Sequence, residues 1–401
     1  MPRLARGLRI LLYSHDTFGL GHVRRSLVMA SALAGSSRVG AQLLVTGSPL
    51  ADRFTLPPRT DIVKLPCVTK VGGGTYAPRS LPIGFDELLC LRRDLILAAA
   101  RAFRPDIVLV DHAPAGMGGE IAATLRLIRR ESPRTRIAVG LRDVVDDAAA
   151  VGAEWSSTGV HELLEDVYDR VLIYGQRSLY DPVREYGFSA RAAAKTRFVG
   201  YLADRGAIPA DGTRLARPLA ADRRQVVVTV GGGGDGAHLL MAVVDAIADG
   251  RMPPDVGWQL VGGPFLPTEV RPRVRRAVRS LPHVRYQDFT PGLGRMLASA
   301  SAVISMGGYN TVCELLASGT PALVVPRVEP RVEQLIRATA LAAGGHIRML
   351  HPAELEAERL GREVATLLDG PRPSREGLAL DGVARATAEL EALMARRAVA
   401  A

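Results

Sequence analysis

Short continuous apolar runs alternate with segments of helical periodicity along the first half of the chain. The runs lack internal polar positions, as in Ile107-Val108-Leu109-Val110, which is typical of parallel strands covered on both faces. The pattern predicts strands at 8–13, 42–46, 61–65, 107–111, 136–141, 170–174 and 197–199. It predicts helices at 23–34, 85–103, 118–130 and 160–168. This alternation of strand and helix favours a doubly wound α/β domain.

The second half of the chain shows the same alternation. We predict strands at 225–230, 258–261, 284–286, 302–305 and 322–325. Helices are predicted at 236–248, 268–279, 292–298, 311–317 and 331–343, and a long amphipathic helix at 387–398. Each half therefore begins with a strand, a glycine-rich loop and a helix.

The two halves are separated by a segment that lacks any periodicity. Residues 204–224 are rich in Pro, Gly, Asp and Arg, so we interpret them as an interdomain linker. The predicted organisation is an N-terminal domain at 1–203 and a C-terminal domain at 225–375. A C-terminal helix at 376–401 follows, with packing against the N-terminal domain as one option. The predicted fold class is α/β, with two Rossmann-like doubly wound domains facing across a cleft.

Composition narrows the class of protein. No apolar run reaches the roughly 18 residues that span a bilayer. Three scattered cysteines, Cys67, Cys90 and Cys313, lack metal-ligand spacing, which favours reduced thiols and a cytoplasmic location. The net charge of +10 comes almost entirely from arginine, and no aromatic-plus-basic pattern accompanies it. We therefore expect no nucleic-acid partner, and peripheral membrane contact is not supported.

The first glycine-rich loop carries the candidate base. It follows the first predicted strand, so it lies at the edge of the sheet where ligands bind in this architecture. His22, beside Gly19 and Gly21, opens the next helix, and a histidine there suits a general base at neutral pH. The alternative is a histidine that only caps the helix or lines the cleft. His15 could act instead, Asp16 or Asp111 could orient the base, and the pair Asp111-His112 is a weaker candidate of the same kind.

The second half has two glycine-rich loops that favour a phosphate ligand. Gly307 and Gly308 precede a helix that opens at Asn310 and Thr311, and a helix N-terminus with exposed N–H groups suits a diphosphate. Glu314, one turn further on, could accept from sugar hydroxyls. The other loop contains Gly231, Gly232, Gly233 and Gly234. It formally fits a dinucleotide fingerprint, but we favour a backbone loop that approaches a sugar or phosphate.

These residues resemble a known family. The glycine loops, Phe289, the Gly307-to-Glu314 helix start, Gly319-x-Pro321 and the pair Glu333-Gln334 are similar to the nucleotide-binding domain of GT-B glycosyltransferases of the peptidoglycan N-acetylglucosaminyltransferase type. The whole chain resembles a bacterial branch of predicted glycosyltransferases. The resemblance implies that Glu314 holds the donor ribose, that Glu333 and Gln334 contact the donor sugar, and that Phe289 and Thr290 border the base. A Gln-Gln pair stands in the peptidoglycan enzyme where this chain has Glu333-Gln334.

The hypothesis is an inverting, metal-independent glycosyltransferase that needs no cofactor. A nucleoside-diphosphate sugar, with UDP favoured, would donate to a small-molecule or natural-product acceptor, since no apolar docking patch is evident in the first half. The first glycine loop also resembles that of the nucleotide-sugar hydrolase of pseudaminic acid synthesis, so hydrolysis stays open. An epimerase, a non-catalytic nucleotide-sugar-binding protein and, less favoured, an oxidoreductase also remain. The acceptor, the sugar, the base and the oligomeric state are not determined by the sequence.

Overall fold

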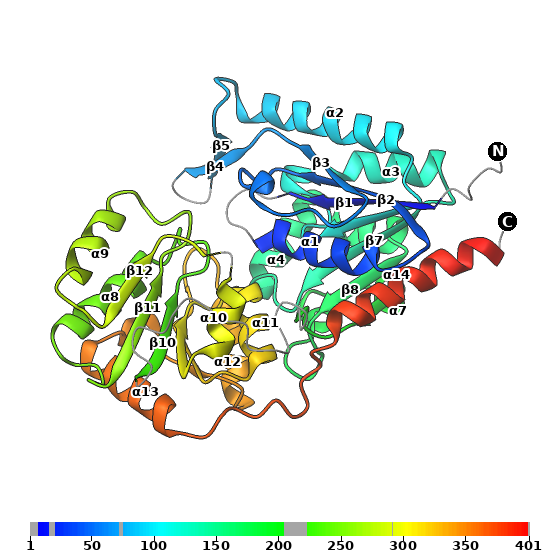
Figure 1. The fold of residues 1–401 in the computed structure, drawn as a ribbon. Coiled ribbons are helices and arrows are strands. Elements are labelled where there is room, and N and C mark those ends of the chain that lie inside the picture. Colours follow the sequence, from blue (N-terminus) through cyan, green and yellow to red (C-terminus); the bar gives the residue numbers. More distant parts are fainter. Residues whose placement is uncertain (1–6, 16–20, 72–74, 204–222, 291, 400–401) are drawn as a thin grey trace. The chain divides into compact units, whose positions relative to one another are not determined.

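The computed structural model describes residues 7–15, 21–71, 75–203, 223–290 and 292–399 (Figure 1). The chain divides into two compact units. The first comprises Met1–Leu202 with Asp381–Ala401, and the second comprises Ala203–Leu380. Apart from residues 223 and 224, the predicted linker at 204–224 lies outside the described residues.

The first unit contains a seven-stranded sheet in the order β3-β2-β1-β6-β7-β8-β9. All neighbouring strands are parallel. The strands are β1 (Leu8–Ser14), β2 (Val39–Thr46), β3 (Thr60–Lys64), β6 (Ile107–Asp111), β7 (Arg136–Arg142), β8 (Arg170–Tyr174) and β9 (Thr196–Phe198). All seven strands predicted for this half are therefore confirmed. The strand order reverses between β1 and β6, and in doubly wound sheets that switch point is where ligands bind.

Helices cover both faces of this sheet. α2 (Phe85–Phe103) and α3 (Ala122–Glu131) lie on one face, while α1 (Gly21–Ala34) and α14 (Gly382–Val399) lie together on the other (Figure 1). α14 is tied to the unit by the ion pair Glu389–Arg170 at 3.3 Å. The remaining helices are α4 (Ala148–Thr158), α5 (Val160–Glu162), α6 (Pro182–Glu185) and α7 (Ala190–Ala194).

Several local expectations for this unit were wrong. The predicted helix at 118–130 starts later, because Gly118 and Gly119 have positive φ and form a 3-10 turn, Met117–Gly119, before α3. No strand was predicted between residues 66 and 84, but β4 (Val68–Val71) and β5 (Thr75–Pro78) pair antiparallel there. The prediction also missed α4, whose N-cap Asp147 accepts from two backbone N–H groups. The predicted helix at 160–168 is a short α5 that continues as a π-helical turn, Leu163–Val167.

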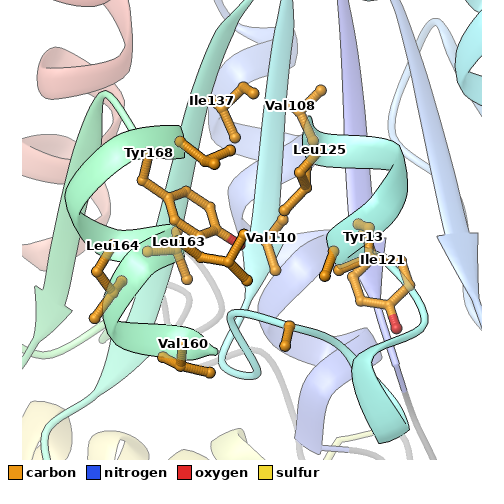
Figure 2. Packing of buried hydrophobic residues seen from close by; sticks show 14 of the residues in the cluster. Tyr13, Val108, Val110, Ile121, Leu125, Ile137, Val160, Leu163, Leu164 and Tyr168 are labelled. Carbon is orange, nitrogen blue, oxygen red and sulfur yellow. The ribbon is translucent and has the colours of Figure 1, made fainter. Parts of the chain in front are cut away.

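The core on the α2–α3 face is continuous across the sheet. Val108 and Val110 of β6 point toward Ile121 and Leu125 of the following segment, and Figure 2 shows Leu163 and Tyr168 closing the other side. These side chains are almost fully buried. Burial of this kind stabilises the sheet by roughly 25 cal/mol per Å² of apolar surface, so it holds the strand ends rigidly in place.

The second unit repeats the same sheet order with six parallel strands, β12-β11-β10-β13-β14-β15. The strands are β10 (Arg224–Thr229), β11 (Val256–Val261), β12 (Val284–Gln287), β13 (Ala302–Ser305), β14 (Ala322–Val324) and β15 (Arg348–Met349). The five predicted strands are confirmed, and β15 was missed because only two residues pair there. The switch point of this sheet lies between β10 and β13.

The helices of the second unit form two groups. α8 (Ala237–Ala248), α9 (Val270–Val278) and α13 (Ala357–Asp369) pack into one apolar core with the sheet. α10 (Leu293–Ser299), α11 (Tyr309–Ser318) and α12 (Glu333–Ala343) group together as well (Figure 1). The sequence predicted all of these except α13. Within the described part of the chain, no helix is both long and apolar enough to cross a bilayer.

Candidate active site

His22 and Asp111 meet at the switch point of the first sheet. Asp111 is the last residue of β6, and His22 lies in the first turn of α1, which follows β1. His22 Nδ1 lies 2.9 Å from Asp111 Oδ2, and the two side chains are 16% and 6% exposed. The sequence predicted both residues but left their contact open. The structure brings them together because β1 and β6 are neighbours in the sheet.

Arg25 completes this cluster, although no role was predicted for it from the sequence. Its Nε donates to Asp111 Oδ1 at 3.0 Å and its Nη2 to Oδ2 at 2.8 Å. Burial alone would raise the pKa of Asp111, but the Arg25 guanidinium and the His22 hydrogen bond outweigh it and hold that pKa well below its usual range. In the tautomer with its proton on Nδ1, His22 donates to Asp111 Oδ2, and Arg25 Nη2 also lies 2.9 Å from the same ring nitrogen. Proton transfer would then use the other ring nitrogen, Nε2.

Two further histidines flank His22. The ring centroids of His15 and His112 lie 4.3 Å and 5.4 Å from that of His22. Arg142 Nη2 lies 2.7 Å from His112 Nε2, so His112 is the neutral tautomer with its proton on Nδ1. Burial lowers the pKa of both flanking histidines well below the usual value, and neighbouring positive groups lower it further. The Nδ1 atoms of both are buried and have no hydrogen-bond partner among the described residues.

A buried ion pair fixes the segments around these histidines. Arg92 of α2 donates to Glu120 at 2.6 and 2.7 Å, and both side chains are fully buried. The same guanidinium donates to the carbonyl of His15 at 3.0 Å and to that of Pro66 at 2.6 Å. Tyr13 donates its hydroxyl hydrogen to Glu120 as well. The pair therefore joins α2, the end of β1, the segment after β3 and the segment after β6.

The structure describes only some of the other residues predicted to lie on the acceptor side of the first loop. Gly21 is the first residue of α1, directly before His22. His15 follows β1 and is half-buried. Gly19 and the alternative orienting residue Asp16 lie outside the described residues. Asp111 rather than Asp16 is therefore the carboxylate that the described structure places beside His22.

The glycine loop after β10 adopts a conformation that requires glycine. Gly231 and Gly233 have φ of 61° and 93°. A Cβ on Gly233 would lie 2.3 Å from the carbonyl oxygen of Gly262, so this loop packs directly on the segment after β11. Phe265 N donates to the Gly232 carbonyl at 2.8 Å across the same contact. The glycine at position 233 therefore serves a compact backbone shape, and Gly232 and Gly234 lie in the same loop.

The glycines after β13 have different surroundings. A Cβ on Gly307 would lie 3.2 Å from Gln334, because α12 approaches the turn there, and Arg337 donates to the Gly307 carbonyl at 3.0 Å. Gly308 has nothing within 4 Å of its Cβ position. It precedes α11, which starts at Tyr309 without a side-chain cap. The open space before the α11 N-terminus is what a diphosphate would need.

The remaining predicted donor residues lie on or near this helix. Asn310, Thr311 and Glu314 all belong to α11, and Glu314 packs close to Gly294 at the start of α10. Phe289 is 41% exposed, so it is not a core residue. Thr290 follows it after β12.

Glu333 and Gln334 begin α12 and are both buried. Arg327, which the sequence analysis did not assign, donates from Nη2 to Glu333 Oε1 at 2.5 Å and from its backbone N–H to Gln334 Oε1 at 3.2 Å. Its Nη1 donates to Asp235 Oδ2 at 2.9 Å. No spacing rule connects Arg327 with Asp235, because the contact joins loops that are 92 positions apart.

Comparisons with known proteins agree with this architecture. The family model described as "Glycosyltransferase family 28 C-terminal domain" matches residues 227–380. The chain is 31% identical over 298 residues to a UDP-N-acetylglucosamine–N-acetylmuramyl-(pentapeptide) pyrophosphoryl-undecaprenol N-acetylglucosamine transferase of Halorhodospira halophila, covering 72% of this chain and 71% of that protein. The chain therefore belongs to glycosyltransferase family 28, as the motif resemblance implied. In the protein of the same name from Gloeobacter violaceus, the match is 30% identical and spans 50% of this chain and 56% of that one.

Solved structures show that the fold is the two-domain GT-B fold. The calicheamicin glycosyltransferase CalG4 matches with a TM-score of 0.64 at 20% identity, covering 98% of this chain and 99% of that one. A putative UDP-N-acetylglucosamine 2-epimerase from Listeria monocytogenes also matches with a TM-score of 0.64, at 14% identity, covering 98% and 97%. The predicted fold class is confirmed. A transferase and a protein titled as an epimerase share it, so the fold does not fix the reaction.

Proposed function

We propose that this protein transfers a sugar from a UDP-sugar to an acceptor that binds the first unit. The observation that carries the proposal is the cluster of His22, Asp111 and Arg25 at the switch point of a family 28 chain. Asp111 orients the ring of His22, and His22 Nε2 removes the proton of the attacking acceptor group. Displacement in line at the anomeric carbon would invert its configuration.

The second unit would hold the donor. The uncapped N-terminus of α11 and the open space at Gly308 favour a diphosphate, whose growing negative charge the backbone N–H groups would stabilise as UDP leaves. Glu314 would bind the ribose and Phe289 would border the base. Because the backbone supplies this stabilisation, the proposal includes neither a cofactor nor a metal ion.

The acceptor is the least constrained part of the proposal. The named acceptor of the Halorhodospira relative is linked to undecaprenol, a lipid. In the described structure, three of the four large exposed apolar side chains, Val71, Leu81 and Leu91, belong to the hairpin and helix segment from β4 to α2. No apolar patch is visible in the sequence there because these residues are scattered among polar ones. This exposure favours an acceptor with an apolar part over a purely polar small molecule.

Hydrolysis of the nucleotide sugar is the second candidate. The structural match to a putative epimerase supports it, since that fold also serves reactions of a nucleotide sugar without a sugar acceptor. The two functions need the same base and the same diphosphate site, and they differ in whether water or an acceptor group reaches His22.

The test measures UDP release from UDP-N-acetylglucosamine and UDP-glucose by the purified protein. Each is assayed alone, with the undecaprenyl-linked muramyl acceptor, and with a panel of hydroxylated small molecules. Release that depends on an acceptor, with a glycosylated product, supports the transferase. Equal release with and without every acceptor supports the hydrolase. No release and no binding of any UDP-sugar would overturn both functions.

A further inference from the structure

Three fully buried polar side chains form a network in the first unit: Tyr13, Arg92 and Glu120. Arg92 of α2 donates to Glu120 Oε2 at 2.6 Å and to Oε1 at 2.7 Å, and Tyr13 of β1 donates its hydroxyl hydrogen to Oε1 as well. Burial, together with the negative charge of Glu120, raises the pKa of Tyr13 well above its usual value, so the hydroxyl keeps its proton and stays a donor. Glu120 therefore receives its hydrogen bonds from two different elements of the unit.

Stability of the fold does not by itself account for an ion pair at this place. The desolvation of two charges largely cancels their mutual attraction, so apolar side chains of similar volume would often give an equally stable fold. An apolar side chain, however, could not donate hydrogen bonds. Arg92 also donates to two backbone carbonyls, from Nη2 to His15 at 3.0 Å and from Nη1 to Pro66 at 2.6 Å. These two contacts are what the guanidinium provides beyond packing.

The His15 carbonyl connects this network to the candidate base. His15 directly follows β1, and its ring centroid lies 4.3 Å from that of His22 at an interplanar angle of 63°. Asp111 holds His22 at Nδ1, at 2.9 Å. A contact at Nδ1 fixes one atom of the ring, whereas the edge contact with His15 restricts its tilt, and the tilt decides where Nε2 points.

His15 is suited to this packing role because it is neutral. Burial lowers its pKa most, and neighbouring positive groups, among them Arg92, lower it further. A neutral ring can lie against His22 without repelling the imidazolium that forms when His22 takes up a proton.

The same guanidinium holds a second segment of the first unit. Pro66 lies between β3, which ends at Lys64, and β4, which begins at Val68. One side chain therefore holds both the end of β1 and the start of the β4–β5 hairpin, and its removal would release both segments together.

We propose that Arg92 is a positioning residue of the catalytic base: it holds the His15 carbonyl, and His15 keeps the ring of His22 in place for proton transfer. This inference rests on the proposed function, in which His22 removes the acceptor proton. Arg92 acts through His15 and does not touch the substrate.

The first experiment measures this geometry without any substrate. In histidine-labelled protein, the ring protons of His15 and His22 should give a mutual nuclear Overhauser effect (NOE), because their ring centroids lie 4.3 Å apart. The double variant Arg92→Met, Glu120→Gln removes both buried charges and should lose most of this NOE. The spectrum of His15→Gln assigns the signals. An NOE of wild-type strength in the double variant would overturn the positioning role, whatever its kcat.

The second experiment measures turnover as UDP release, under the conditions that give turnover in the wild-type protein. In the double variant, kcat should fall by roughly tenfold to a hundredfold, because the base is misplaced, whereas the Kd of UDP should change by less than about twofold. Arg129→Met is the matched control in the same unit. Arg129 contacts Asp169 and the Val167 carbonyl rather than a histidine, so this variant should keep both the NOE and kcat.

Denaturant unfolding shows whether each variant is folded under the assay conditions. If the double variant does not fold, Arg92→Lys takes its place. It keeps a positive charge beside Glu120 but lacks the planar fork that reaches both carbonyls, so it should also lose most of the NOE and lower kcat.

The outcomes separate this inference from the proposed function. If the wild-type protein turns over and the double variant keeps both the NOE and full kcat, Arg92 only stabilises the fold, and the inference fails while the proposed function stands. If the NOE is lost but kcat is unchanged, His15 does not position the base and the inference also fails. If the wild-type protein releases no UDP with any donor and acceptor, the proposed function fails and the inference fails with it.

Discussion

The two sheets of this protein have the same strand order and the same switch point, yet different chemistry occupies the two switch points. At the end of β1 and β6, the described residues bring together His15, His22, His112, Arg25 and Asp111, all of which are ionisable. At the end of β10 and β13, glycines and an uncapped helix N-terminus dominate. The strand order therefore places a ligand-binding switch point at the same edge of each sheet. The residue types around that point decide which chemistry it can support.

The comparison shows two ways to stabilise charge. In the first unit, side chains are held by other side chains, as Asp111 is by Arg25, so their protonation states can be tuned. In the second unit, backbone N–H groups are fixed by the fold and cannot titrate. Proton transfer is favoured by side chains whose protonation can be tuned, as in the first unit. Binding of a permanently charged diphosphate is favoured by fixed backbone N–H groups, as in the second unit. The proposed division into an acceptor side and a donor side follows from this difference.

The largest expected effect concerns His22. His22→Ala should lower kcat by ~10²- to 10⁴-fold, because it removes the base, while the Kd of UDP stays within a factor of two or so. Steady-state kinetics and calorimetry measure the two quantities. His283→Ala, a substitution in the second unit, serves as control. Full turnover by His22→Ala would show that the first switch point is not catalytic.

The next effect concerns the buried pair beneath the first switch point. Arg92→Met should destabilise the fold by about 3–5 kcal/mol, because Glu120 is left as a buried, unpaired charge. Denaturant unfolding of the full chain measures this change. The double variant Arg92→Met, Glu120→Gln should recover part of the loss, since it removes the charge as well. A loss below about 1 kcal/mol for the single variant would mean that water reaches Glu120.

A matched glycine pair tests the second switch point. Gly308→Ala should leave the unfolding transition unchanged, because nothing lies within 4 Å of the added Cβ, but should weaken UDP binding by about tenfold if the ligand fills that space. Gly307→Ala should lower both stability and affinity, because its Cβ would crowd Gln334. Unchanged UDP affinity in Gly308→Ala would place the diphosphate elsewhere.

The smallest effect is a pH dependence from the flanking histidines. The folded-state pKa of His112 lies below its unfolded value of about 6.5, so the unfolded state binds the extra proton. Stability should therefore fall as the pH falls below about 6.5, with a slope of up to about 1.4 kcal/mol per pH unit for this group. His112→Asn should flatten the slope, and asparagine tolerates the φ of 67° at this position. Unfolding at pH 7.5, 6.5 and 5.5 measures it; parallel curves for the two proteins would contradict the prediction.

Most of the fold could be predicted from the sequence, because buried parallel strands appear as continuous apolar runs. All twelve predicted strands exist, and α2 was located to the residue. The hairpin of β4 and β5 was missed because its glycine-rich connection masks two short strands, and α4 was missed because its alanine-rich sequence lacks a clear apolar face. Short strands and an alanine-rich helix such as these are poorly predicted from the local sequence, since tertiary packing decides whether they form.

The class of fold, the family and the positions of His22 and the glycine loops could be predicted, because these depend on residue types at short spacing. Which side chains meet could not: Asp111 contacts His22, Arg92 contacts Glu120, and Arg327 contacts Asp235. Each of these pairs joins segments that are far apart in the chain, with sequence separations from 28 to 92 positions. The order in which strands pair fixes such contacts, and strand order is a property of the folded sheet rather than of any local pattern.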